Sequence, residues 1–139
     1  MGSVKYVKAE DHVEPSGTTN NGQTLQLDRL PGIWLNTNPA SRGIVKVIVE
    51  ARGNGLVVQA FGAGNATPLD WGPVEAEYIY ASGLSSHTAA GFSAWYHFEF
   101  SDTHLQANWN QGLLVLASFT TFKDGSRRSN YFSREFFHQ

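Results

Sequence analysis

The sequence predicts an all-β protein, and three observations lead to that prediction. From Leu30 onward, apolar and polar residues alternate with a period of two, as in half-buried strands. Gly, Asn, Asp and Pro separate the apolar runs, as they do between the strands of hairpins. No later segment has the i, i+3, i+4 spacing of an amphipathic helix. The expected runs lie near 32–37, 43–52, 55–62, 72–81, 89–100, 103–110, 113–123 and 129–138.

The composition limits the class of protein. The chain has 139 residues, no Cys, 10 basic and 12 acidic residues, and 4 Trp, 5 Tyr and 9 Phe. Without Cys there is no disulfide, thiolate metal ligand or Cys nucleophile. The slight acidic excess argues against a nucleic-acid partner. No run reaches the roughly 18 apolar residues of a membrane span, and we see no secretory signal, so we expect a cytoplasmic protein with no membrane span.

The polarity of the chain changes near residue 28. Residues 1–28 are polar and rich in turn formers, with too few apolar residues to offset the entropy of ordering. We therefore expect a flexible N-terminal arm over 1–28 and a single β-domain over 29–139.

The faces of the predicted strands follow from the alternation of side chains. In the 43–62 region, Val47 and Val49 share a face with Val58 and Ala60 for any two-residue turn. In the next hairpin, a turn at 101–102 predicts that Tyr96 pairs with Ala107.

That register also places Glu99 opposite His104 and His97 opposite Gln106 on the other face. These three polar residues, His97, Glu99 and His104, have no fixed spacing of metal ligands. We expect an exposed polar patch there and no metal site.

Eight short antiparallel strands with one apolar face predict an up-and-down β-barrel, because closure removes the exposed edges. A barrel of eight strands is wide enough to be filled by side chains or to hold one small ligand. A two-sheet sandwich is the alternative, since periodicity does not distinguish the two.

The 113–123 run is apolar on both faces. Leu113, Val115 and Phe119 lie on one face, and Leu114 and Leu116 lie on the other. The outer face needs a cover, which the N-terminal arm or a second subunit would supply. We expect a homo-oligomer.

The first strand begins with Gly32-Ile33-Trp34, followed shortly by Asn36. This opening resembles the Gly-x-Trp start of the calycin barrels, the lipocalins and avidins, and Asn36 resembles the Asn of the avidin opening. The resemblance implies a lipocalin-like barrel in which Trp34 lies at the closed end beneath an Arg from a late strand. Arg134 is the residue that matches that Arg.

Aromatic residues on the predicted inner faces point to a ligand in the lumen. Tyr side chains combine a large apolar area with a hydroxyl that must find a buried partner, which suits a pocket that orients a ligand. Trp71 ends a glycine-rich loop and is expected either to cover the barrel mouth or to anchor the loop. The predicted ligand-binding residues are Trp34, Asn36, Tyr78, Tyr80, Tyr96, Phe98, Trp109, Ser118 and Thr120.

The last strand brings an ionisable group to the lumen. A two-residue turn at 124–125 sends Tyr131, Ser133 and Glu135 inwards, whereas a loop one residue longer sends Arg134 inwards. The calycin resemblance favours Arg134. A carboxyl in an apolar barrel has its charged form disfavoured and can act as a general acid or base.

The preferred function is the binding of a hydrophobic or aromatic small molecule in the lumen, with no cofactor. The alternative is a cofactor-independent cyclase, isomerase or dehydratase that acts on a natural-product intermediate, with Glu135, Tyr131 and Arg134 as candidate catalytic residues. A third hypothesis is a carbohydrate-binding module that uses Trp95, Asn108 and Asn110 on the outer face.

Overall fold

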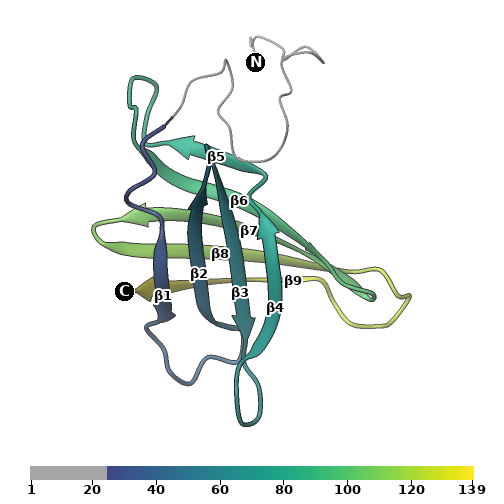
Figure 1. The fold of residues 1–139 in the computed structure, drawn as a ribbon. Coiled ribbons are helices and arrows are strands. Elements are labelled where there is room, and N and C mark those ends of the chain that lie inside the picture. The colour runs from purple at the N-terminus through teal and green to yellow at the C-terminus, as the bar shows by residue number, and fades with distance from the viewer. Residues whose placement is uncertain (1–24) are drawn as a thin grey trace, which may run out of the picture.

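The protein was analysed as a computed structural model that describes residues 25–139, and those residues form nine antiparallel strands. They make one sheet with the order β4-β3-β2-β1-β9-β8-β7-β6-β5 (Figure 1). The all-β prediction is confirmed. The strands are β1 Gly32–Asn36, β2 Ile44–Arg52, β3 Gly55–Gly62, β4 Leu69–Glu75, β5 Tyr78–Ala81, β6 Ala89–His97, β7 Ser101–Asn110, β8 Leu113–Phe122 and β9 Tyr131–His138. Among residues 25–139, no helix is long and apolar enough to cross a membrane.

The sheet curls around one interior but has two edges, β4 and β5, with no strand pairing between them in the described residues. The short connection between these strands bonds to both halves of the sheet. The Ala76 N–H donates to the Leu56 carbonyl on β3 at 2.9 Å, and the Glu77 N–H donates to the Ser93 carbonyl on β6 at 2.6 Å. The chain itself therefore bridges the gap between the two edges.

The predicted 72–81 run is two strands, and this reverses the faces of two tyrosines. Glu77 is an extra residue beside Ser93, which pairs with Tyr78 in the β5–β6 ladder. The alternation is shifted by one, so Ile79 is buried and Tyr80 is 53% exposed on the outer face. The prediction that Tyr78 and Tyr80 face the interior is wrong, because it assumed one uninterrupted strand.

The β6–β7 hairpin keeps its predicted faces but not its predicted register. Tyr96 pairs with Thr103 rather than Ala107, and His104 pairs with Trp95 rather than Glu99. The chain turns two residues earlier than expected. Because the shift is even, the same side chains still face inwards.

The other hairpins follow the alternation. Val47 pairs with Ala60 and Val49 with Val58, so these residues share a face, as predicted for the β2–β3 hairpin. Between β7 and β8 the turn lies at 111–112. Gln111 and Gly112 both have positive φ, 54° and 87°, which matches a two-residue hairpin turn.

One apolar cluster fills most of the interior. Its largest fully buried side chains are Trp34, Phe92 and Phe137, and the Trp34 indole N–H donates to the Leu30 carbonyl at 2.9 Å. Leu25, near the end of the predicted N-terminal arm, is also buried in this cluster. Gln26 next to it exchanges backbone hydrogen bonds with the segment 87–89. The rest of that arm, residues 1–24, lies outside the described residues.

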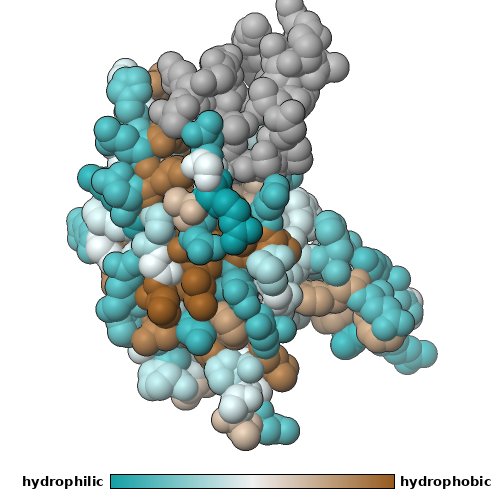
Figure 2. Space-filling model, in the orientation of Figure 1, coloured by the Kyte–Doolittle hydropathy of each residue, from teal (hydrophilic) through white to brown (hydrophobic). Residues whose placement is uncertain are grey.

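The outer surface retains large apolar side chains. Figure 2 shows apolar side chains among polar ones over the β1–β4 side, where Ile33 and Leu35 of β1 are exposed. On β8, Leu113 and Phe119 are exposed as well, and Val115 is half-buried. Assembly into a homo-oligomer stays a prediction.

The Tyr96 hydroxyl holds β6 against β3 and β4. It accepts a hydrogen bond from the Ala60 N–H at 2.9 Å and donates to the Gly72 carbonyl at 2.6 Å. Replacing Tyr96 with Phe leaves both backbone groups without this partner, so we expect Tyr96→Phe to lower the free energy of unfolding by ~1–3 kcal/mol. Urea denaturation measures this. Tyr80→Phe, at an exposed ring, is the matched control and should change stability by less than ~0.5 kcal/mol; equal effects of the two changes would contradict the assignment.

The same hydroxyl makes stability depend on alkaline pH. Burial raises the pKa of Tyr96 from 10.0 to about 12, because the phenolate is poorly solvated. The unfolded chain loses this proton at lower pH than the folded chain, so the contribution is complete below pH 10 and is lost as the pH rises towards 12. The stability advantage of the native protein over Tyr96→Phe should therefore shrink by up to ~3 kcal/mol across that range. A constant difference in urea titrations from pH 9 to 12 would refute it.

Candidate functional site

A cavity of about 520 Å³ lies at one end of the interior. Its walls come from the loop between β1 and β2, from the β3–β4 end, and from β7, β8 and β9. We call it the inner cavity. Arg42 and Glu135 are the charged residues among its lining. The other polar or aromatic side chains that line it are Asn38, Ser41, Trp71, Thr103, Ser118, Thr120, Tyr131 and Ser133.

Strand register places hydroxyl groups side by side in this cavity. Thr103 pairs with Thr120, and Ser118 pairs with Ser133. The oxygens of the first pair are 3.0 Å apart and those of the second pair 2.7 Å apart. Two hydroxyls that share one hydrogen bond still have one hydrogen to donate. In each pair that hydrogen finds no acceptor among residues 25–139.

These hydroxyls are largely withdrawn from solvent. Thr103 is 3% exposed, and Ser118 and Thr120 are each 7% exposed. Buried polar groups in folded proteins nearly always have a partner, which is protein, water or ligand. The inner cavity therefore has two hydrogen-bond donors that a bound molecule would satisfy.

Glu135 is the carboxylate of the inner cavity. The β8–β9 pairing puts Glu135 beside Leu116 on the inner face and Arg134 beside Ala117 on the outer face. This agrees with the inward set that includes Glu135. The expectation that Arg134 lies on Trp34 is wrong, because the two side chains are on opposite faces of the sheet.

The loop between β1 and β2 holds one oxygen of Glu135. The Ser41 hydroxyl donates to Glu135 Oε1 at 3.0 Å and accepts a bond from the Gly43 N–H at 3.1 Å. A Cβ atom on Gly43 would lie 3.3 Å from the same Oε1, so only a small residue fits there easily. Oε2 makes no hydrogen bond with residues 25–139 and is available to a ligand.

Trp71 of β4 forms an aromatic wall. Its ring meets Tyr96 and Phe98 edge to face, with centroids 5.3 and 5.2 Å away. On the other side Gly62 lies so close that an added Cβ would be 2.8 Å from the indole nitrogen. Trp71 is thus fixed at the cavity edge, whereas the sequence left open whether it covers the mouth or anchors the loop.

Asp70 fixes the backbone on both sides of Trp71. Its carboxylate accepts bonds from the Gln59 side chain at 2.8 and 2.9 Å and from the Gly72 N–H at 2.8 Å. The bonds from Gln59 and then from Gly72 hold the pKa of Asp70 below its usual value. Asp70 thereby stays ionised and keeps the turn around Trp71 in place.

The remaining predicted lumen residues have structural roles. Asn36 donates from Nδ2 to the Ile44 carbonyl at 2.8 Å and accepts from the Asn38 N–H at 2.7 Å, so its amide is used in shaping the loop. Trp34 and Tyr96 also have their polar atoms satisfied. Trp109 is half-buried, with the guanidinium of Arg29 4.4 Å above its ring.

Of the predicted ligand-binding residues, Ser118 and Thr120 line the inner cavity, together with Tyr131 and Glu135 from the catalytic set. Thr103 and Ser41 were not predicted. The alternation in 103–110 already puts Thr103 on the inner face, and the correct turn position would have paired it with Tyr96. No sequence pattern links Ser41 to Glu135, because their contact is between distant segments.

The histidines of the outer polar patch on β6 and β7 contact carboxylates of the same chain. His97 Nδ1 lies 2.8 Å from Asp102 Oδ1, which Lys123 also contacts at 2.8 Å. The bonds from Lys123 and then His97 lower the pKa of Asp102. His104 lies 3.3 Å from the Glu77 carboxylate. Within the described range 25–139, no group of three or more His, Cys, Asp or Glu residues is arranged to hold a metal ion.

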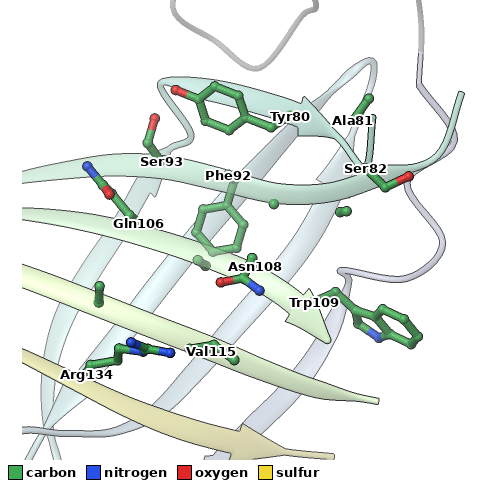
Figure 3. Close-up of a pocket in the computed structure, with 14 residues that line it drawn as sticks. Tyr80, Ala81, Ser82, Phe92, Ser93, Gln106, Asn108, Trp109, Val115 and Arg134 are labelled. Atoms are coloured by element: carbon green, nitrogen blue, oxygen red, sulfur yellow. The ribbon is translucent and has the colours of Figure 1, made fainter. Parts of the chain in front are cut away.

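A second hollow, of about 600 Å³, lies on the outer face of β5–β9 (Figure 3). We call it the outer trough. Trp95, Asn108 and Asn110, the residues of the carbohydrate hypothesis, lie on this same outer face by the β6–β7 and β7–β8 pairing. Ser93, Gln106, Asn108, Ala117 and Arg134 are among the residues that line the trough.

Comparison of the chain with known protein families, with curated proteins and with solved structures gives no match. The calycin resemblance therefore rests on the Gly32-x-Trp34 opening and on Asn36. Function has to be inferred from the geometry of the two hollows.

We expect that replacing one of the paired threonines with Val destabilises the protein, whereas replacing both changes its stability little. Thr120→Val leaves the buried Thr103 hydroxyl without its partner, so we expect a loss of ~1–3 kcal/mol in the free energy of unfolding. The double change Thr103→Val with Thr120→Val removes both polar groups at constant shape and should be within ~1 kcal/mol of the native protein, or more stable. Urea denaturation of the three proteins tests this. A larger loss in the double variant than in Thr120→Val would show that the pair contributes stability and is not kept for a ligand.

Proposed function

We propose that the protein binds a small aromatic molecule carrying polar groups in the inner cavity. One observation carries the proposal: two hydroxyl hydrogens, one from the buried Thr103–Thr120 pair and one from the part-buried Ser118–Ser133 pair, line a single cavity with Glu135 Oε2, and all three lack partners among residues 25–139. A ligand that accepts two hydrogen bonds and donates one would satisfy all three groups.

The walls favour an aromatic ligand over a long aliphatic one. The rings of Trp71 and Tyr131 flank the cavity and offer faces or edges for stacking. The deeper interior is occupied by Trp34, Phe92 and Phe137, which leaves no channel for an extended chain. A volume of about 520 Å³ lies within the roughly 300–1,000 Å³ of ordinary small-molecule sites.

The proposal includes a calycin-like barrel as the scaffold. The bonds from Ala76 to β3 and from Glu77 to β6 connect the two edges through the chain between them. The Tyr96 hydroxyl adds a link from β6 to β4 across the interior. Together with the Gly32-x-Trp34 opening, these links support a barrel that is closed by hydrogen bonds from a few single residues. A barrel of the usual kind would instead have a ladder of paired residues between β4 and β5.

Turnover of the ligand is the second candidate function. Glu135 has one oxygen held by Ser41 and one oxygen available, as a positioned general acid or base requires. The Tyr131 side chain lines the same cavity and would supply a second proton-transfer group. This version corresponds to a cofactor-independent isomerase, cyclase or dehydratase.

Native mass spectrometry of protein from its own source, followed by a fluorescence screen with mono- and bicyclic phenols, tests the proposal. We expect a retained or added small molecule at one per chain. Glu135→Gln should weaken binding of a responding phenol about tenfold, the loss of one charge-assisted hydrogen bond. Glu75→Gln, at an exposed carboxylate of β4, is the matched control.

The outcomes separate the two candidates. A phenol recovered unchanged supports binding, whereas a product that forms with the native protein and not with Glu135→Gln supports turnover. Equal affinities for Glu135→Gln and Glu75→Gln, or no ligand in either assay, would contradict the inner cavity as the site.

A further inference from the structure

The outer face of β6–β9, in and beside the outer trough, has a regular pattern of side chains, because its residues lie in three parallel rows across the strands. One row is aromatic and consists of Trp95, His104, Phe119 and Phe132, which pair in that order. The next row is small and polar and contains Ser93, Gln106, Ala117 and Arg134. The third contains Gly91, Asn108 and Val115.

The aromatic row forms a platform beside the trough. The rings of Trp95 and His104 stack with centroids 4.1 Å apart and planes within 12°, and Phe119 and Phe132 stack at 5.8 Å and 21°. The three apolar rings of the row are exposed. Four strands span about 14 Å, the length of two to three sugar rings. Because the stacked rings turn their faces towards each other, the row presents mainly ring edges to solvent, and these apolar edges can pack against the C–H groups of sugars.

The floor of the trough is low because Gly91 and Ala117 have little or no side chain. Planar polar groups rise from it: the Gln106 and Asn108 amides and the Arg134 guanidinium (Figure 3). Gln106 uses its Nε2 on His104 at 3.4 Å, which leaves its carbonyl oxygen for a hydroxyl donor. Such amides can donate and accept at once, as sugar hydroxyls require.

Arg134 is the cationic group of the outer trough, and its charge favours an anionic ligand. It forms no hydrogen bond or ion pair with other residues of 25–139, although guanidinium groups favour bidentate carboxylate partners. The Glu77 carboxylate lies at the β5 end of the face and is already bonded to Ser93 and His104. An anionic group would therefore be attracted to the β9 end, next to Arg134.

We propose that the outer trough is a second binding site, for an acidic saccharide whose rings lie along the aromatic row and whose carboxylate is bound by Arg134. This site is on the opposite face of the sheet from the inner cavity. The proposal is independent of the small-molecule function, since Arg134 and Glu135 point to different sides.

A second copy of the chain is the competing occupant of this face. Arg and aromatic residues are common in subunit interfaces, so Arg134 and the aromatic row do not distinguish the two occupants. The cores of such interfaces are packed as densely as protein interiors, whereas the centre of this trough is hollow. Concavity, together with the lack of a carboxylate partner for Arg134 among residues 25–139, thus favours a polar, anionic ligand.

Calorimetric titration with the trimer of galacturonic acid, at low salt, tests the proposal. The methyl ester of the same trimer keeps the rings and removes the negative charge. We expect the acidic trimer to bind one per chain and the ester to bind at least tenfold more weakly.

Three variants locate the binding. Arg134→Gln should weaken the acidic trimer at least tenfold, and Ala117→Leu, which fills the floor, should abolish binding of both forms. Arg127→Gln removes the same charge from the exposed loop before β9 and should retain the native affinity. Thermal unfolding confirms that each variant is folded.

Equal affinity for the acid and its ester would overturn the role of Arg134. Equal losses in Arg134→Gln and Arg127→Gln would show only general attraction of charge. No binding of either form, or a stable dimer in sedimentation that Ala117→Leu dissociates, would overturn the saccharide site in favour of an interface between copies.

Discussion

The hydrogen bonds of the Tyr96 hydroxyl are the constraint on which the rest of the structure depends. Burial of the apolar inner face brings the first half of the nine-stranded sheet onto its last half. The hydroxyl fixes how the two halves meet, because it joins β6 to the Ala60 N–H on β3 and to the Gly72 carbonyl on β4 in the buried interior. Because Gly72 follows Trp71, the same contact sets the position of the cavity wall.

The interior is divided into an apolar half and a hydroxyl-rich half. The apolar half is filled by Trp34, Phe92 and Phe137. Their only side-chain polar atom is the Trp34 indole nitrogen, which donates to the Leu30 carbonyl. In the second half, β7 to β9 present Thr and Ser at positions where Leu or Val would pack better. A protein selected for stability alone would avoid such half-satisfied groups. This division is the reason for proposing that a ligand binds in the second half.

The alternation of side chains predicts much of this arrangement, because one buried face imposes a strict period. It places Ser118 and Thr120 inwards and leaves Trp95 outside. It does not decide between Glu135 and Arg134, because that choice depends on the length of the loop before β9. The alternation gives the wrong faces for Tyr78 and Tyr80, because Glu77 is an extra residue that shifts it by one. No local sequence pattern predicts that irregularity. It also misses the turn between β6 and β7, since an even shift in register preserves both faces. The Ser41–Glu135 contact, across 94 positions, lies beyond any local pattern.

The two sides of β9 give the strand an unusual sensitivity to length changes. Glu135 and Arg134 are neighbours in sequence, yet Glu135 lines the inner cavity and Arg134 lines the outer trough. Gain or loss of one residue in the loop 123–130 allows β9 to keep its register with β8. The same change inside β9 would exchange the charges of the two faces, giving a cation in the inner cavity and an anion in the outer trough. Insertions and deletions in relatives of this protein should therefore be confined to the loop.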